Sequence, residues 1–271
     1  MPFNASPQMR VLYSDRMIDP AQSLSGFAVG AIVGLTGVGG GSLMTPILVL
    51  LFGIHPATAV GTDLLHAAIT KSGGTYIHAK AGRVDWRITR LLAFGSLPAA
   101  VATLAGLRYF TGGLGGSKII TVTLGVALLL TAMALLLRTY LRRLSKTHIT
   151  PPAPHPAFTV LTGVALGFLV TVSSVGAGAL GVTALFFLYP HLKAARIVGS
   201  DLAHAVPLTL VAGIGHWLFG SVDWMLLGSL LIGSLPGIYI GSHFAGRVPE
   251  TILRMLLAVM LLLVGAKLIA Y

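Results

Sequence analysis

Long apolar stretches, separated by short polar segments, make up most of the chain from residue 22 onward. Several of them reach the roughly 20 residues with which an α-helix crosses the hydrocarbon core of a bilayer. The pattern therefore predicts an all-α integral membrane protein. Unbroken membrane helices are expected at residues 57–79, 88–110, 118–141, 195–219, 224–245 and 251–270.

Two further apolar stretches carry a run of small residues at their centre. The first is too long for one simple span and is interrupted by Gly37-Val38-Gly39-Gly40-Gly41-Ser42, and the second by Ser173-Ser174-Val175-Gly176-Ala177-Gly178. Glycine weakens a helix and lets another backbone approach closely. Each stretch is therefore predicted to form two half-helices. In the first stretch they cover residues 23–35 and 42–51; in the second, one covers residues 157–172 and the other follows the break and ends at residue 189.

The chain repeats itself at a fixed spacing of 138 positions. The segment Gly61-Thr62-Asp63-Leu64-Leu65-His66-Ala67 returns as Gly199-Ser200-Asp201-Leu202-Ala203-His204-Ala205, and Gly95-Ser96-Leu97-Pro98 returns as Gly233-Ser234-Leu235-Pro236. Duplicated halves with polar groups at membrane depth are typical of secondary transporters. The predicted organisation is a polar tail (1–21), a first transmembrane repeat (22–141), a linker (142–156) and a second transmembrane repeat (157–271).

Charge predicts how the repeats are oriented. Basic residues cluster over 80–90 and over 138–146, which places both segments on the cytoplasmic side. The loop equivalent to the first cluster in the second copy, 220–223, has no Lys or Arg and is expected outside. Equivalent loops on opposite sides indicate inverted repeats, if the broken stretches are re-entrant hairpins and each copy has three true crossings. If the broken stretches span the membrane instead, the repeats are parallel.

Composition supports a multi-pass protein of the cell membrane. Hydrophobic residues make up 55% of the chain and charged residues 9%, against about 25% charged in a soluble domain. The net charge of +11 is attributed mainly to cytoplasmic loops, with a basic funnel for anions as the alternative. The chain has no cysteine, which excludes thiolate metal sites. No cofactor, metal or nucleic-acid partner is expected.

The two breaks are the first candidate site. Each break frees backbone N–H groups at the start of the following half-helix, where the helix dipole favours an anion. Close helix packing at small residues is the alternative explanation. A small oxyanion is expected near the midplane, bound by backbone amides and hydroxyl groups of Gly39, Gly40, Gly41, Ser42, Thr62, Ser173, Ser174, Gly176, Ala177, Gly178 and Ser200.

Ionisable residues repeat near these breaks. Asp63 and His66 are three positions apart and share a helix face, as do Asp201 and His204. The two histidines, together with Lys71, are expected to supply cationic or donor character to the bound anion. The two aspartates are expected either to brace the tips or to exchange protons during transport, because a free carboxylate would repel an anion.

Other polar residues are assigned supporting roles. His78 and His216 lie near helix ends and are expected to be gating residues. Asp85 and Asp223 each precede a tryptophan and are predicted to be helix N-caps. An enzyme is not expected, because HExxH and Gly-x-Ser-x-Gly motifs are absent and the Asp–His pairs are symmetric duplicates.

At these residues the chain resembles the sulfite exporter TauE/SafE family, also called the toluene sulfonate uptake permease family. The resemblance covers residue 26 to the C-terminus and rests on Gly34-x-x-Gly37-x-Gly39-Gly40-Gly41-x-x-x-x-Pro46-x-Leu48, followed by Gly-Thr-Asp at residue 61. The second copy departs from this motif at Ala177 and Thr183, so the two halves of the site need not contact the substrate equally.

The resemblance implies transport of sulfite, sulfonates or sulfoacetate-like organosulfonates across the cytoplasmic membrane. It leaves the direction of transport, the coupling ion and the oligomeric state open. The alternative is a cation or proton antiporter in which Asp63 and Asp201 bind the coupling ion.

Overall fold

The computed structural model of the chain describes residues 19–36, 41–111, 122, 125–133, 135–137, 155–243 and 250–270. Every element in these ranges is an α-helix, as predicted. The first half contains α2 (Pro20–Thr36), α3 (Gly41–Leu50), α4 (Pro56–Lys80) and α5 (Trp86–Thr111), and residues 125–133 and 135–137 are also helical. The second half contains α7 (Pro156–Ser173), α8 (Leu180–Leu188), α9 (Ala194–Leu218), α10 (Trp224–His243) and α11 (Glu250–Ala270).

Several of these helices are long and apolar enough to cross a membrane. By length and composition, four of the described helices qualify: Trp86–Tyr109, Pro156–Ser173, Ala194–Leu218 and Trp224–Gly241. Helix α4 has the same length as α9, 25 residues, but it carries more polar side chains. The described helices therefore indicate a multi-pass membrane protein.

Local sequence sets where the helices begin. At the start of α5, the Oδ1 atom of Asp85 accepts a 3.1 Å hydrogen bond from the backbone amide of Arg87. At the start of α10, the Oδ1 atom of Asp223 accepts a 2.9 Å hydrogen bond from the backbone amide of Leu226. Both predicted N-caps are confirmed. Helices α4 and α7 instead begin with proline, whose missing N–H is not needed at the first helical position.

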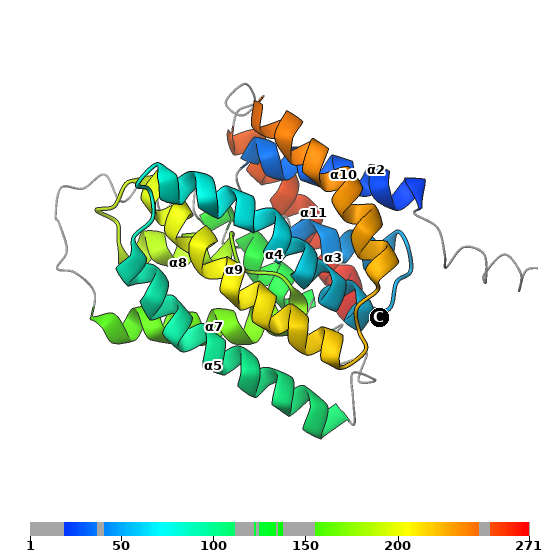
Figure 1. The fold of residues 1–271 in the computed structure, drawn as a ribbon, viewed down its shortest axis with the longest axis horizontal. Helices are drawn as coiled ribbons and strands as arrows, with labels where there is room; N and C mark the ends of the chain where they lie inside the picture. The colour runs from blue at the N-terminus through cyan, green and yellow to red at the C-terminus, as the bar shows by residue number, and fades with distance from the viewer. Residues whose placement is uncertain are drawn as a thin grey trace, which may run out of the picture.

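Helices from opposite halves of the chain pair along their lengths. Helix α10 packs on α2, α5 packs on α7, and α9 packs on both α4 and α5; Figure 1 shows α10 lying along α2 and α9 between α4 and α5. Glycine permits this close packing. A Cβ atom on Gly26 would lie 2.6 Å from the Leu230 carbonyl oxygen, and one on Gly30 would collide with the Ser234 carbonyl oxygen. The contact of Gly26 with Leu230 is followed, four residues later in both helices, by that of Gly30 with Ser234, so α2 and α10 run parallel.

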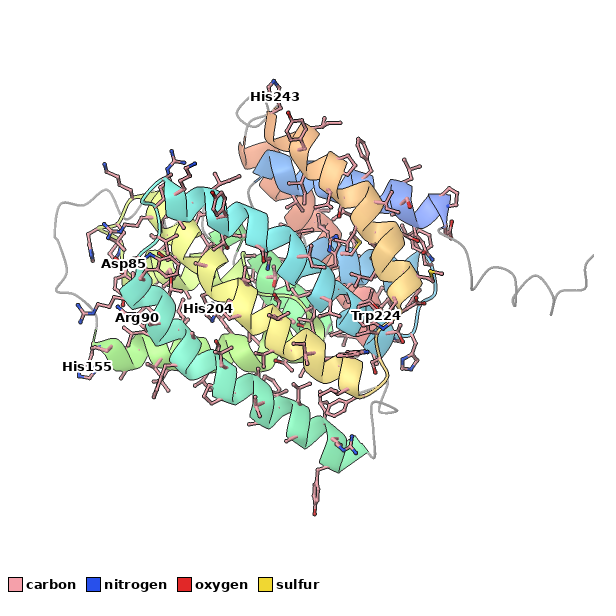
Figure 2. All side chains as sticks on the ribbon, in the orientation of Figure 1. Asp85, Arg90, His155, His204, Trp224 and His243 are labelled. Carbon is pink, nitrogen blue, oxygen red and sulfur yellow. The ribbon has the colours of Figure 1, made fainter. Side chains whose placement is uncertain are left out.

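Helices α4 and α9 run in opposite directions. The amide of Asp85, which follows α4, donates to Ser200 Oγ near the start of α9 at 2.8 Å. The amide of Asp223, which follows α9, donates to Thr62 Oγ1 near the start of α4 at 3.0 Å. These two bonds are equivalent under the 138-residue spacing. Figure 2 shows Asp85 and Trp224 at opposite ends of the molecule, with His204 of α9 between them.

The second broken stretch forms a hairpin. Helix α7 ends at Ser173 and α8 begins at Leu180, so the predicted break is present. The hydroxyl groups of Thr159, near the start of α7, and Tyr189, just after α8, are hydrogen-bonded at 2.7 Å. The outer ends of the two half-helices therefore meet. In the first stretch, α2 and α3 lie on either side of residues 37–40, which are outside the described residues.

Candidate functional site

Buried ionisable side chains gather where α4 contacts α9. Asp63, His66 and Lys71 of α4 and Asp201 and His204 of α9 are all buried, with 5% or less of their surface exposed. Burying such groups costs free energy unless each has hydrogen-bond or charge partners. The partners of these five residues therefore define what the site can do.

Lys71 connects α4 to the break between α7 and α8. Its Nζ atom donates to the carbonyl oxygen of Ala177 at 3.0 Å, and the carboxylates of Asp201 and Asp63 attract its charge. The structure thus brings together two predicted site residues from different halves of the chain. The residue equivalent to Lys71 in the second half is Thr209, whose hydroxyl donates within its own helix at 2.9 Å. Among the described residues, Lys71 therefore has no basic equivalent in the second half.

The break itself is a tight, buried turn. Ser174 is in the left-handed region at φ 57°, and Gly176 and Gly178 have φ values of 118° and 115°. Glycine adopts such angles readily, because it has no Cβ atom to clash with the backbone. The sequence Ser-Val-Gly-Ala-Gly therefore reverses the chain over a few residues, with Ser173 and Ser174 buried.

The turn leaves backbone donors without acceptors. The amide of Val175 donates to Ser173 Oγ at 3.2 Å. Within the described part of the chain, no hydrogen bond uses the amides of Gly176, Ala177 or Gly178. Buried N–H groups are almost always paired in folded proteins, so a run of unpaired ones is suited to a ligand with several acceptor atoms.

Each buried carboxylate lies against the half-helix that follows the break of its own half. Thr45 Oγ1 of α3 donates to Asp63 Oδ2 at 2.6 Å. In the second half, a Cβ atom on Gly181 of α8 would collide with Asp201 Oδ1. Asp63 also lies near His66, with its Oδ1 atom 3.6 Å from His66 Nδ1. This arrangement suits a bracing role for the carboxylates.

The two central histidines reach helices of the opposite half. His66 Nε2 lies 2.8 Å from Ser234 Oγ of α10, and His204 Nε2 lies 2.8 Å from Ser96 Oγ of α5. Neither serine was among the predicted site residues. The duplicated Gly-Ser-Leu-Pro block was the signal that could have identified them, because it repeats at the same spacing as the Asp–His pairs.

Thr62 and Ser200 are engaged elsewhere. Their hydroxyl oxygens accept hydrogen bonds from the backbone amides of Asp223 and Asp85, respectively, in the loops that lead into α10 and α5. These are the loops at opposite ends of the α4–α9 pair, so the two hydroxyls hold the ends of the pair together. A contact of either residue with the substrate stays a prediction.

His78 and His216 contact backbone of the opposite half or lie close to it. His216 is buried, and its Nε2 donates to the Thr171 carbonyl oxygen of α7 at 2.9 Å. His78 is partly buried, and its Nδ1 atom would lie 3.1 Å from a Cβ atom on Gly199 of α9. Their gating role stays a prediction.

The predicted residues of the first break are only partly covered. Gly39 and Gly40 lie outside the described residues. Gly41 begins α3 and Ser42 follows it, and the structure describes their backbone alone. The second break therefore carries the geometric argument for the site.

Comparisons with known proteins give the family. The family model described as sulfite exporter TauE/SafE matches residues 23–268. Probable membrane transporter protein YjnA of Bacillus subtilis (strain 168) is 41% identical, covering 91% of this chain and 98% of its own length. Probable membrane transporter protein YdhB of the same organism is 29% identical over 84% of this chain and 91% of its own.

More distant relatives carry the same description. Probable membrane transporter protein MJ0441 of Methanocaldococcus jannaschii is 26% identical over 91% of this chain and 93% of its own length. No solved structure matches the chain. The match of the family model over nearly the whole chain and the similarity to YjnA lead to one conclusion: the chain belongs to the sulfite exporter TauE/SafE family of membrane transporters.

Proposed function

We propose that the protein is a secondary transporter that moves small sulfur-containing oxyanions, such as sulfite or organosulfonates, across the cytoplasmic membrane. The family description supports this substrate class, and the names of the relatives support transport without naming a substrate. The donors at the second break support a substrate with several anionic oxygen atoms.

The observation that carries the proposal is the meeting of Lys71 with the break between α7 and α8. An ammonium group has three donors, and the Ala177 carbonyl uses one of them. The remaining donors, together with the amides of Gly176, Ala177 and Gly178, would bind the oxygen atoms of a sulfite or sulfonate group. Burial disfavours the charged form of Lys71, and the carboxylates of Asp201 and Asp63 favour it.

Replacing Lys71 with methionine tests this proposal directly. Lys71→Met removes a charge-assisted hydrogen bond worth about 1.5–3 kcal/mol while keeping most of the side-chain volume. In proteoliposomes, we expect the initial rate of uptake of radiolabelled sulfite, measured below saturation, to fall at least about tenfold. Lys80→Met is the matched control, because Lys80 is on the same helix but exposed at its end. Uptake at the wild-type rate by Lys71→Met would show that the lysine does not bind the anion.

We also propose that the repeats over 22–141 and 157–271 are inverted, each with a re-entrant hairpin and three crossings. The opposite directions of α4 and α9 support this arrangement. A two-fold axis in the membrane plane relates helices that run in opposite directions, whereas an axis along the membrane normal would leave them parallel. The bond between Thr159 and Tyr189 supports the hairpin, so α7 is assigned to a re-entrant segment although its length would allow a crossing. Transport would then occur by rocking one bundle against the other around the site.

The distribution of charge supports the cytoplasmic assignment of one end. Arg196, at the start of α9, forms an ion pair with Asp85 in the loop before α5, at 3.3 Å. This contact brings Lys193 and Arg196 to the same end as the basic cluster over residues 80–90. Under the positive-inside rule, that end faces the cytoplasm.

The antiporter remains the second candidate, because Asp63 and Asp201 are both fully buried in the α4–α9 contact. Carboxylates at membrane depth are commonly part of proton or cation pathways. The two functions differ in what drives the flux. Sodium or proton flux in liposomes that contain no sulfur oxyanion would select the antiporter, and flux that requires sulfite would select the anion transporter.

A further inference from the structure

We propose that Ser96 and Ser234 are positioning residues that hold the imidazoles of His204 and His66 with the proton on Nδ1, so that His204 offers an N–H donor to the transported anion and His66 directs its N–H group at the Asp63 carboxylate. This inference rests on the proposed anion transport and adds two residues and a defined hydrogen-bond polarity to the same site. It assigns the serines no direct contact with the substrate.

The two serine–histidine pairs are equivalent and well formed. Each joins Nε2 to Oγ at 2.8 Å, and each joins a central helix of one half to a helix of the other half. All four side chains are buried, with 3% or less of their surface exposed. The two halves differ where Lys71 in one is replaced by Thr209 in the other, yet both contain this pair.

Close helix packing holds each serine in place. The Ser96 carbonyl oxygen of α5 would collide with a Cβ atom on Gly167 of α7, and the Ser234 carbonyl oxygen of α10 would collide with one on Gly30 of α2. Helices α7 and α2 are the half-helices that precede the two breaks. Each serine therefore connects a central histidine to the helix that leads into a break.

The hydroxyl groups of these serines are free to donate to imidazole. Other buried serine and threonine hydroxyls, such as those of Ser229 and Thr171, donate to a carbonyl oxygen four residues earlier in their own helix. Among the described residues, His204 Nε2 is the one hydrogen-bond partner of Ser96 Oγ, and His66 Nε2 is that of Ser234 Oγ. A buried hydroxyl without an acceptor costs free energy, so the serine proton is directed to Nε2.

A proton donated to Nε2 fixes the other nitrogen. A neutral imidazole has one donor and one acceptor, so a ring that accepts at Nε2 carries its own proton on Nδ1. His66 Nδ1 faces Asp63 Oδ1 at 3.6 Å, which favours a proton there. His204 Nδ1 is buried and has no hydrogen-bond partner among the described residues. The Nδ1 atom of His204 is therefore left for a ligand, whereas that of His66 faces a carboxylate.

Kinetics of uptake test the positioning role. Ser96→Ala and Ser234→Ala each remove only the hydroxyl, and we expect the KM for radiolabelled sulfite to rise about tenfold while the maximal rate stays within about twofold, as for a lost buried hydrogen bond. The matched control is Ser229→Ala, since Ser229 is also fully buried on α10 but its hydroxyl donates within its own helix. If the KM values of all three variants equal that of wild type, the proposal is wrong.

The tautomer can be measured without transport. Nitrogen NMR of the full-length protein, labelled with nitrogen-15 at histidine and reconstituted in nanodiscs, distinguishes protonated from unprotonated ring nitrogens. His204→Gln and His66→Gln variants assign the two signals. We expect Nδ1–H in wild type for both rings and a mixed population at His204 in Ser96→Ala. A proton on Nε2 in the wild-type rings would overturn the proposal.

The outcomes separate this inference from the proposed function. Normal KM in Ser96→Ala, combined with a severe loss in Lys71→Met, would refute positioning and leave anion binding intact. Normal uptake by Lys71→Met would instead refute the proposed site, even if the NMR measurement gives the expected tautomer.

Discussion

At the scale of single residues, the buried carboxylates show how charge is managed inside this protein. Asp63 accepts a hydrogen bond from the hydroxyl group of Thr45 of α3, and Asp201 lies against Gly181 of α8. The contact of each carboxylate with a half-helix of its own half supports a bracing role, which stays a prediction, and both carboxylates favour the charged form of Lys71. An ionised carboxylate with such partners can lie near an anion site at reduced electrostatic cost. Proton exchange by either aspartate stays a prediction.

Removing the donor to Asp63 tests the bracing role. Thr45→Val has nearly the same shape but leaves Oδ2 of the buried carboxylate without its hydroxyl partner. A hydrogen bond to a charged group contributes about 1.5–3 kcal/mol, so we expect a loss of that size in the free energy of unfolding. Denaturant titration in detergent micelles would measure it.

Thr131→Val is the control for this substitution. Thr131 is also fully buried, but its hydroxyl donates to the Ala127 carbonyl oxygen within its own helix at 2.7 Å. We expect a smaller loss there, because the carbonyl keeps its helical partner. Equal losses in the two variants would argue against a special role for the Thr45–Asp63 bond.

The sequence predicted some of the contacts among the candidate site residues and missed others, for a physical reason. Spacing along a helix determines which residues share a face, so the Asp63–His66 proximity could be predicted. Spacing does not determine which partner lies opposite that face. Lys71 was predicted as a donor, but its contact with Ala177 depends on how α7 and α8 pack, and Ser96 and Ser234 were missed for the same reason.

At the scale of elements, helix boundaries follow local chemistry and helix partners do not. The predicted boundaries of α4, α5 and α9 agree with the structure to within about two residues, which is the usual uncertainty of a helix end. Proline, aspartate caps and glycine act within a few residues, so the sequence reveals them. The pairing of α2 with α10 depends on matching surfaces about two hundred residues apart.

The glycines of the α2–α10 contact give a prediction at this scale. A Cβ atom on Gly237 would collide with the Phe27 carbonyl oxygen, which is backbone and cannot move aside alone. We expect Gly237→Ala to lower the free energy of unfolding by about 1–3 kcal/mol, as overpacking does. Gly228, on the same helix, has no atom within 4 Å of the place that a Cβ atom would take, so Gly228→Ala should be neutral or stabilising by up to about 1 kcal/mol. Thermal unfolding in detergent compares the two; a stable Gly237→Ala variant would mean that the helices can separate at little cost.

At the scale of the whole molecule, the two halves exchange helices rather than folding separately. The first half supplies α2 to α10 of the second, and the second supplies α7 to α5 of the first. The central pair, α4 and α9, lies in opposite directions. Each half therefore packs its described helices against the other half, and we expect neither half to fold alone.

Membrane orientation can be tested with single cysteines, because the natural chain has none. Gly82 and Gly220 are equivalent loop positions with left-handed φ values of 65° and 75° and no atoms within 4 Å of a Cβ position, so cysteine strains both similarly. We expect a membrane-impermeant maleimide applied to intact cells to label Gly220→Cys and not Gly82→Cys. Lysis of the cells should expose Gly82→Cys as a control for reactivity. Labelling of both positions from outside would contradict inverted repeats.

The sequence by itself determined the features that act locally or repeat. It predicted the all-α membrane class, the helix ends, the second break and the duplicated Asp–His pairs. Apolar length, capping residues, glycine runs and internal repetition can all be recognised in the sequence without knowing the fold. The tertiary structure alone decided which helices pair, that α4 and α9 oppose each other, and that Lys71 meets Ala177 while the histidines meet Ser96 and Ser234. Those contacts join residues from opposite halves, and long-range packing free energy, which no local pattern encodes, selects them.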